Sequence, residues 1–253
     1  EFYVCDDLTC HEGKPRLNHL VLLCKNETGY KNIAYLNAVA FRDGFHYKPR
    51  IDRKILAEHS EGLICLSACL AGEIPRAIVG REFDRAERLV EWYKGVFGDD
   101  FYLEMQDHGI PEQAEVNKYL RVYSKKYGIK LVATNDVHYV EKSDARSQDV
   151  LLCVQTGADY DDPNRMRFPN DEFYLKTEEE MSALFKDDSE AITNTLEIAD
   201  KCNFGFVYGH YMFPHYIPET GEEPTVYIRK LIDEGVKKKY GEETPEIRDR
   251  IES

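Results

Sequence analysis

Apolar runs alternate with amphipathic stretches along the first 157 residues of this sequence. Four times, a run rich in β-favouring residues is followed by a turn and then by apolar positions at helical spacing. The predicted strands lie at 18–26, 61–72, 99–109 and 129–140, and the predicted helices at 27–44, 83–98, 112–128 and 143–157. Continuous apolar strands that alternate with helices are typical of a parallel sheet with both faces covered. The pattern therefore predicts an α/β barrel or a doubly wound sheet.

The pattern changes after residue 157. Residues 159–176 are polar and rich in turn residues, which predicts a loop with one short strand. Thr177 and Glu180 have the spacing of a capping box at the start of a helix. We expect a further helix, a proline-rich connector and another helix at 189–203, 213–225 and 226–241.

Charge and cysteine usage limit the class of protein. The chain has 33 basic and 47 acidic residues and a net charge of −14, so it has little electrostatic attraction for a phosphate backbone. Any strong grip on nucleic acid must therefore lie elsewhere. Its seven cysteines are an odd number without CxxC spacing, which favours a reducing cytoplasm over a disulfide framework. The sequence shows no signal-peptide pattern and no apolar run long enough to span a membrane.

Side chains of the metal-ligand type follow three of the predicted strands. Cys69 closes GLICLSAC, His108 closes FYLEMQDH, and Asp136 with His138 closes LVATNDVH. Binding sites in parallel α/β folds form at the carboxyl ends of the strands. A divalent transition ion accepts imidazole, carboxylate and thiolate ligands together, and such ions commonly hold a hydrolytic water. The recurrence at three strand ends therefore predicts a metal-assisted hydrolytic site.

Each of these residues also has a purely structural interpretation. A lone cysteine such as Cys69 is most often a small buried apolar residue, and His108 could equally be a solvent-facing loop residue. Strand alternation would point Asp136 and His138 to one face, whereas Asn135–Asp136 is also a typical turn pair. Neither a nucleotide-binding glycine motif nor a GxSxG elbow is present. The residues alone thus predict a cytoplasmic α/β protein with a candidate metal site and no identified substrate.

Seven phrases of the sequence resemble, in order, the amino-terminal region of the bacterial DNA polymerase III alpha subunits, a family of replicative DNA polymerases. They are HLVLLCKNETGYKNI, GFHYKPRID, EGLICLSACLAGEIP, FGDDFYLEMQDHGIPEQ, LVATNDVHY, EFYLKTEEEM and NTLEIADKCN. The resemblance covers essentially the whole chain. In that family the region is a PHP (polymerase and histidinol phosphatase) domain. The resemblance therefore implies an incomplete, distorted (β/α)7 barrel with a C-terminal helical extension.

The resemblance also implies a set of ligands for ions of the zinc or manganese type. Glu1 stands where the family has the Glu of its GxE strand, His19 matches the His that opens HLVLL, Cys69 matches the ligand position of SACL, and Asp136 and His138 match the closing D-x-H. Only the resemblance supports His19, because this residue precedes its strand. His108 lies at the family's active-site end and is our candidate catalytic residue.

This chain departs from the family at its beginning. The family's H-x-H and T-D-H-G motifs are absent, so we expect the chain as given to form only one wall of the metal site. The sequence opens in the middle of a predicted strand and stops in the opening turns of a helix at 245–253. We therefore expect a fragment: a PHP domain without its first strands at 1–205, and a linker with the first helices toward the polymerase body at 206–253.

The resemblance implies that the parent is a DNA-directed DNA polymerase, a nucleotidyltransferase that uses DNA and dNTPs in the cytoplasm. Its partners would be a sliding clamp, a clamp loader and a proofreading exonuclease, and magnesium would bind in a polymerase palm that this chain lacks. Two functions stay open for the PHP part: a metal-dependent phosphoesterase or 3′–5′ exonuclease, or a non-catalytic scaffold that stabilises the polymerase and docks the exonuclease. A free-standing enzyme like histidinol phosphatase fits less well, because residues 172–181 and 194–203 belong to the replicase resemblance.

Overall fold

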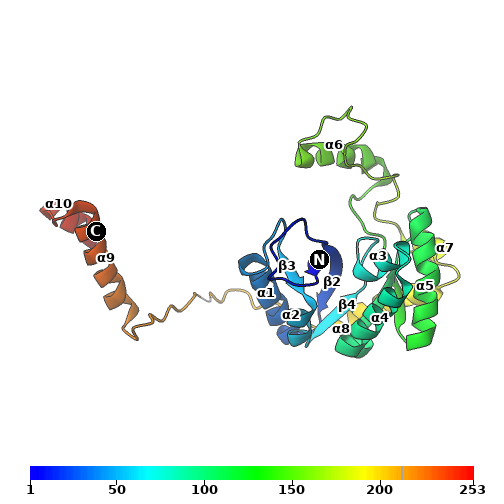
Figure 1. The fold of residues 1–253 in the computed structure, drawn as a ribbon, viewed down its shortest axis with the longest axis horizontal. Helices are drawn as coiled ribbons and strands as arrows, with labels where there is room; N and C mark the ends of the chain where they lie inside the picture. The colour runs from blue at the N-terminus through cyan, green and yellow to red at the C-terminus, as the bar shows by residue number, and fades with distance from the viewer. Residues whose placement is uncertain (212) are drawn as a thin grey trace. The chain divides into compact units, whose positions relative to one another are not determined.

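The computed structural model describes residues 1–211 and 213–253. The chain divides into two compact units, Glu1–Gly205 and Phe206–Ser253. The first unit contains a sheet with helices on both of its faces, and the second contains two helices (Figure 1). That these units are a PHP domain and a linker toward a polymerase body stays a prediction.

The sheet has six strands in the order β3-β1-β2-β4-β5-β6. Their bounds are β1 Phe2–Cys5, β2 Asn18–Cys24, β3 Arg50–Asp52, β4 Leu63–Leu66, β5 Phe101–Met105 and β6 Lys130–Ala133. Strand β1 is parallel to β3, and β4, β5 and β6 are parallel to one another. Strand β2 is antiparallel to both of its neighbours, β1 and β4.

The predicted fold class is confirmed, but the prediction of a purely parallel sheet is wrong at β2. The apolar run LVLL reads the same in either direction, so its composition could not reveal the orientation. The reversal has a structural consequence. The start of β2 lies at the same edge of the sheet as the carboxyl ends of β4, β5 and β6, so a residue that opens β2 can reach residues that follow the other strands.

Helices fill the connections of the first unit. They are α1 Glu27–Arg42, α2 Arg53–Glu58, α3 Glu73–Val79, α4 Phe83–Phe97, α5 Pro111–Tyr127, α6 Ala145–Thr156, α7 Glu178–Leu184 and α8 Ser189–Lys201. The predicted capping box is present, since Thr177 accepts from the Glu180 backbone and Glu180 accepts from the Thr177 backbone. Helices α2 and α3 and strand β3 were not predicted, because each is short and lacks a full amphipathic period.

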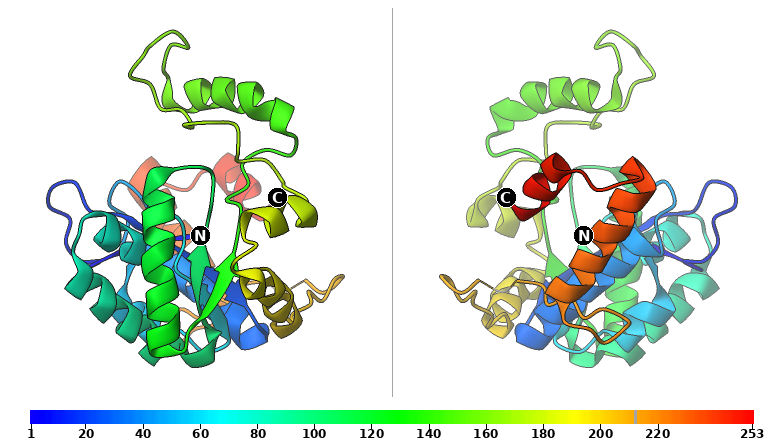
Figure 2. Two further views of the ribbon diagram at one scale, coloured as in Figure 1. Left: turned by 90° about the vertical axis from the view of Figure 1, so that its right-hand side faces the viewer. Right: turned by 90° about the vertical axis from the view of Figure 1, so that its left-hand side faces the viewer.

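Both faces of the sheet are buried at its centre. The larger core packs the inward faces of α1 to α5 against one face, through residues such as Cys65 and Leu103. On the opposite face, Ile64, Tyr102 and Val132 pack with Ile198 of α8. Figure 2 shows α5 and α8 on opposite sides of β6. The face covered by α8 is apolar in its middle and polar toward the carboxyl ends of the strands, where it carries the buried Glu104.

The segment after β6 leaves the body of the first unit. Strand β6 ends at Ala133, so the predicted strand to residue 140 is too long. We predicted one short strand within residues 159–176. Among the described residues, this segment instead forms an isolated β-bridge, in which Tyr174 pairs with Tyr139. Helix α6 stands apart from the sheet and its covering helices (Figure 1).

The second unit confirms both helices predicted from the sequence. They are α9 Pro224–Tyr240 and α10 Pro245–Glu252. Glu223 caps α9 by accepting from the backbone N–H groups of Thr225 and Val226, and Thr244 caps α10 through the N–H of Ile247. Among the described residues, no helix has the length and apolar character needed to cross a membrane.

Candidate metal site

Register and alternation bring β1 and β2 residues onto the face that α8 partly covers. Tyr3 lies directly opposite His19 in the antiparallel pair, and their rings meet edge to face at 5.2 Å. Glu1 is two residues before Tyr3, and successive side chains alternate between faces, so Glu1 points to the same side. Because β2 is reversed, His19 lies at the edge where β4 ends.

The turn after β4 carries Cys69 to this edge. Ala68 adopts a left-handed backbone with φ 63°, which costs about 1–2 kcal/mol for a residue with a side chain. The turn closes through a hydrogen bond of 2.8 Å from Gly72 N to Cys69 O. Only glycine fits at position 72, since an added Cβ would lie 2.3 Å from the carbonyl oxygen of Ser67. A second bond, from His19 N to Ala71 O at 3.0 Å, ties this turn to β2.

Glu1, His19 and Cys69 form a compact group of three different donors. His19 Nδ1 lies 2.6 Å from Glu1 Oε1 and 3.6 Å from Cys69 Sγ. One ligand atom from each residue lies within 4.8 Å of the others. The His19 side chain is 27% exposed and that of Glu1 52%, so the group is open to solvent. The carboxylate of Glu1 and the sulfur of Cys69 therefore both lie next to Nδ1 of His19, in a place that solvent can reach.

The short contacts within this group shift the pKa values of His19 and Glu1. Hydrogen bonding with Cys69 and then with Glu1 raises the pKa of His19 to about 9, against the opposing effect of burial. The hydrogen bond from His19 lowers the pKa of the Glu1 carboxyl, against the opposing effect of burial. The shifts of His19 and Glu1 both favour a charged imidazolium next to a carboxylate. A carboxylate and an imidazole are also ligand types that a divalent transition ion accepts.

Asp136 and His138 lie in a turn after β6. Asp136 has φ 45°, so the turn interpretation of Asn135–Asp136 is correct and strand alternation does not orient the pair. His138 Nδ1 lies 2.6 Å from the backbone oxygen of Asp136, which assigns the ring proton to Nδ1 and leaves the Nε2 lone pair to coordinate. The ring packs 4.6 Å from Phe168.

The structure brings three of the five predicted ligands, Glu1, His19 and Cys69, into one group, and a role for Asp136 and His138 as ligands stays a prediction. Asp136 and His138 fall outside the 4.8 Å group. Strands β1 and β6 are four positions apart in the sheet, which is about 19 Å in a flat sheet at ~4.8 Å per strand.

His108 is buried, with 1% of its surface exposed, so the solvent-facing interpretation is wrong. Its Nδ1 accepts from Gln113 Nε2 at 2.8 Å, and its Nε2 lies 2.8 Å from Asn135 O, to which it donates. Its ring stacks on Phe173 at 4.1 Å. Both ring nitrogens are thus used within the protein. These contacts hold the turn that carries Asp136, and a catalytic role for His108 stays a prediction.

Sequence analysis missed Glu104, which lies on β5 behind the candidate ligands and is 6% exposed. Its carboxylate accepts from Ala68 N, Thr134 Oγ1 and Gln106 Nε2. Burial raises the pKa of Glu104, while the bonds from Thr134 and Gln106 oppose that rise. A signal was present in the sequence: FYLEM places one glutamate inside an otherwise apolar strand.

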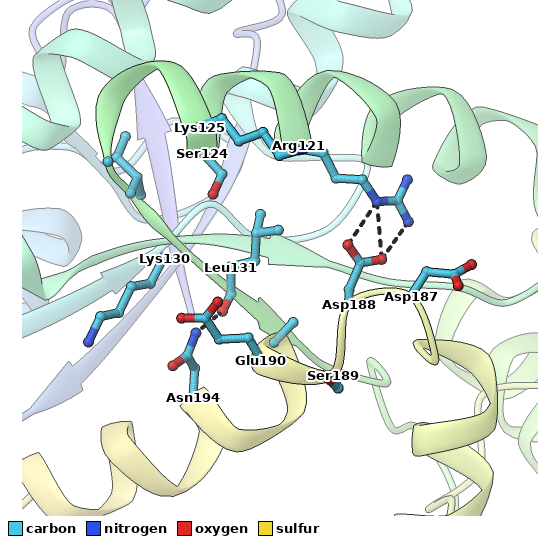
Figure 3. Close-up of a pocket in the computed structure, with 13 residues that line it drawn as sticks. Arg121, Ser124, Lys125, Lys130, Leu131, Asp187, Asp188, Ser189, Glu190 and Asn194 are labelled. Atoms are coloured by element: carbon cyan, nitrogen blue, oxygen red, sulfur yellow. Dashed lines mark hydrogen bonds and ion pairs between the residues drawn. The ribbon is translucent and has the colours of Figure 1, made fainter.

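A cavity of about 610 Å³ lies at the opposite end of the strands, between α5 and α8 (Figure 3). Arg121 reaches across it to Asp188, with contacts of 2.6–3.1 Å, and Asn194 donates to Leu131 O at 2.7 Å. None of the predicted ligands lines this cavity. Its ion pair and hydrogen bond join α5 and β6 to the start of α8, so we assign it to packing.

The donor set fits a transition ion. A carboxylate, an imidazole and a thiolate are together typical of zinc, and the carboxylate and imidazole also suit manganese. The three ligand atoms already lie within 4.8 Å of one another, and binding of an ion would release protons from these groups.

Comparison with known proteins adds the family context. Residues 1–108 match the model of the PHP domain. The chain is 46% identical over 234 residues to the DNA polymerase III subunit alpha of Borreliella burgdorferi, which covers 92% of this chain and 20% of the relative. It is 42% identical over 248 residues to that of Treponema pallidum (97% and 21%) and 45% identical over 228 residues to that of Thermus aquaticus (88% and 19%). The chain thus spans about a fifth of the length of the curated relatives it matches.

Proposed function

This chain carries a PHP domain and is homologous to DNA polymerase III alpha subunits, and from that premise we propose that it is part of a replicative DNA polymerase and forms a divalent-metal site within it. The parent would carry out DNA-templated synthesis from dNTPs, with magnesium in a polymerase palm outside this chain. Its partners would be DNA, a sliding clamp, a clamp loader and a proofreading exonuclease. The seven cysteines are free thiols, which supports a cytoplasmic location.

One observation carries the metal proposal: Glu1 Oε1 and Cys69 Sγ converge on His19 Nδ1. Glu1, His19 and Cys69 would hold the ion, and Asp136 with His138 would be further ligands in the same wall of the site. The thiolate of Cys69 favours zinc over manganese. A bound ion of this kind supplies Lewis acidity, which polarises a phosphoryl oxygen and raises the acidity of a neighbouring water.

The residues of the chain prepare the site in distinct ways. His138 is oriented by the bond from its Nδ1–H to Asp136 O, so that its other nitrogen is available. Asp136 and Glu1 provide the negative charge that a cation needs. Phe168 packs against the His138 ring, with 4.6 Å between the ring centroids, and would restrict its movement. This arrangement suits hydrolysis of a phosphodiester, and we propose a 3′–5′ exonuclease or related phosphoesterase reaction on DNA.

The net charge of −14 affects how such a substrate would bind. An acidic chain repels a polyanion, so this unit would not hold DNA by its own electrostatic field. We propose that the remainder of the polymerase supplies the binding affinity for DNA and delivers a 3′ end to the site.

A second candidate function has its own support. The three donors come from the start of β1, the start of β2 and the turn after β4, so an ion would tie these elements together. Such an ion would be structural, and the unit would be a scaffold that stabilises the polymerase and docks a separate exonuclease. The thiolate and imidazole donors suit structural zinc as well as catalytic zinc.

Metal analysis of the purified protein tests the common premise. We expect bound zinc or manganese after desalting, and loss of that metal in Cys69→Ala. The matched control is Cys202→Ala, which removes an exposed free thiol outside the group and should leave the metal content unchanged. A wild-type chain that takes up neither ion, even when both are supplied in excess, would overturn the proposal.

A nuclease assay on the full-length polymerase separates the two functions. The catalytic proposal predicts metal-dependent shortening of a 3′-labelled oligonucleotide, abolished by His138→Ala. The scaffold proposal predicts no hydrolysis, together with a lower melting temperature after metal removal.

A further inference from the structure

Glu104 connects the two turns that carry the candidate ligands. It lies on β5 between β4 and β6, in register with Val132, and faces the same side of the sheet as His19. Its side chain is buried, and its two carboxylate oxygens accept from different segments. One oxygen accepts a hydrogen bond from the turn that contains Cys69, and the other accepts a hydrogen bond from Thr134, which begins the turn that contains Asp136.

The first oxygen fixes the turn after β4. Glu104 Oε2 accepts from the backbone N–H of Ala68 at 3.1 Å. Ser67 Oγ accepts from the backbone N–H of Glu104 at 2.8 Å, so two bonds join these segments. Ala68 has the left-handed conformation that directs the chain toward His19. The next residue is Cys69, whose sulfur lies 3.6 Å from His19 Nδ1.

The second oxygen fixes the turn after β6. Glu104 Oε1 accepts from Thr134 Oγ1 at 2.5 Å and from Gln106 Nε2 at 3.0 Å. Gln106 Nε2 also lies 3.3 Å from Thr134 Oγ1, which closes a ring of contacts. Thr134 is followed by Asn135 and Asp136, where the chain enters its own left-handed turn.

We propose that Glu104 is a positioning residue for the metal site, one that sets the distance between the Cys69 turn and the Asp136–His138 turn through its two oxygens. This inference rests on the proposed metal site. It also explains why an acidic side chain is buried in the strand FYLEM, where an apolar residue would fold at lower desolvation cost. Only a carboxylate accepts at both oxygens at once.

The variants Glu104→Gln and Thr134→Val remove this function in different ways. Glutamine keeps one accepting oxygen and replaces the other with a donor, so one of the two turns loses its bond. Valine keeps the shape of threonine and removes the hydroxyl. Thr134→Ser keeps the hydroxyl and is the conservative variant that should restore wild-type behaviour.

Cobalt(II) is the probe, because it replaces zinc and a cobalt–thiolate bond gives a charge-transfer absorption that reports on Cys69 directly. We expect Glu104→Gln and Thr134→Val to weaken cobalt binding by roughly tenfold to a hundredfold, as is usual when a residue behind a ligand is changed. We also expect the thiolate band to be weaker at saturating cobalt, and Thr134→Ser to bind as the wild type does.

The matched control is Tyr102→Phe, on the same strand and face, which removes hydrogen bonds to Glu197 and Lys201 at the other end of β5. Tyr102→Phe should lower the melting temperature measured in the presence of a metal chelator, and it should leave the cobalt spectrum unchanged. If Glu104→Gln and Thr134→Val lower the melting temperature but bind cobalt with wild-type affinity and band intensity, the positioning role is refuted. If Glu104→Gln does not fold, the comparison of cobalt binding between Thr134→Val and Thr134→Ser decides the question. A wild-type chain that binds no cobalt instead refutes the proposed metal site.

Discussion

Glu197→Gln tests how α8 is held over the apolar half of the face that carries the candidate site. Glu197 accepts from Tyr102 OH at 2.7 Å and pairs with Lys201 at 3.2 Å and with Lys130 at the start of β6. These contacts lower the pKa of Glu197 to about 2, with the bond from Lys130 the largest cause. The Glu197 carboxylate therefore links α8 to β5 through Tyr102 and to β6 through Lys130.

The expected magnitude follows from the pKa and from the exposure. A fall from 4.5 to about 2 would correspond to about 3.4 kcal/mol at 1.36 kcal/mol per pKa unit if the pair were shielded from water. The Glu197 side chain is 31% exposed, and pairs open to water are worth about 0.2–1 kcal/mol each. Glutamine can still accept from Tyr102. We therefore expect Glu197→Gln to lower the free energy of unfolding by about 1 kcal/mol.

Urea unfolding at several pH values measures this difference. Because the pKa is lower in the folded state, the stabilisation is present above the ordinary pKa of 4.5 and is lost as the pH falls toward 2. The difference between wild type and variant should be constant from about pH 7 to pH 6 and should shrink by about pH 3.5. The control Glu61→Gln changes an exposed glutamate and should be neutral. A Glu197→Gln variant as stable as the wild type at neutral pH, or a difference that does not shrink in acid, would refute the reasoning.

Three further outcomes follow from the described contacts. Gly72→Ala places a Cβ 2.3 Å from Ser67 O, so it should shift the Cys69 turn, lower the melting temperature and reduce zinc uptake in a titration. Thr177→Ala removes the side-chain acceptor for the Glu180 N–H and should destabilise the protein by about 1 kcal/mol in urea unfolding. Chelation should lower the melting temperature of the metal-loaded wild type, by an amount equivalent to about 2.7 kcal/mol where metal had been at 100 times its Kd, and should not affect Cys69→Ala.

Helix positions were the most predictable part of the fold. A capping box such as Thr177 with Glu180 is a local signal, and its contacts involve residues three apart. Strand direction is not local. The apolar run of β2 pairs with β1 and β4, and only those partners determine that it runs antiparallel to both. The sequence therefore predicted the existence of β2 and could not predict its orientation.

The antiparallel direction of β2 also determines which of the candidate site residues could be predicted from the sequence. Cys69 follows its strand, so the rule that ligands gather at carboxyl ends identified it. His19 precedes its strand and fails that rule, although it occupies the same edge because β2 is reversed. The family resemblance alone indicated His19. Glu104 lay inside a strand, where a single polar residue gives no periodic signal and its partners are distant in sequence.

A turn and a metal ligand were alternative interpretations of Asp136, and the geometry makes them compatible. The left-handed backbone at Asp136 directs its carbonyl oxygen to His138 Nδ1, and that bond leaves the other ring nitrogen available. The strained turn must be held by its surroundings, since an isolated chain would relax it. His108 holds it through Asn135 O, and Glu104 holds it through Thr134. A buried histidine and a buried carboxylate thus both support this turn, as the proposed role of Asp136 and His138 as ligands would require.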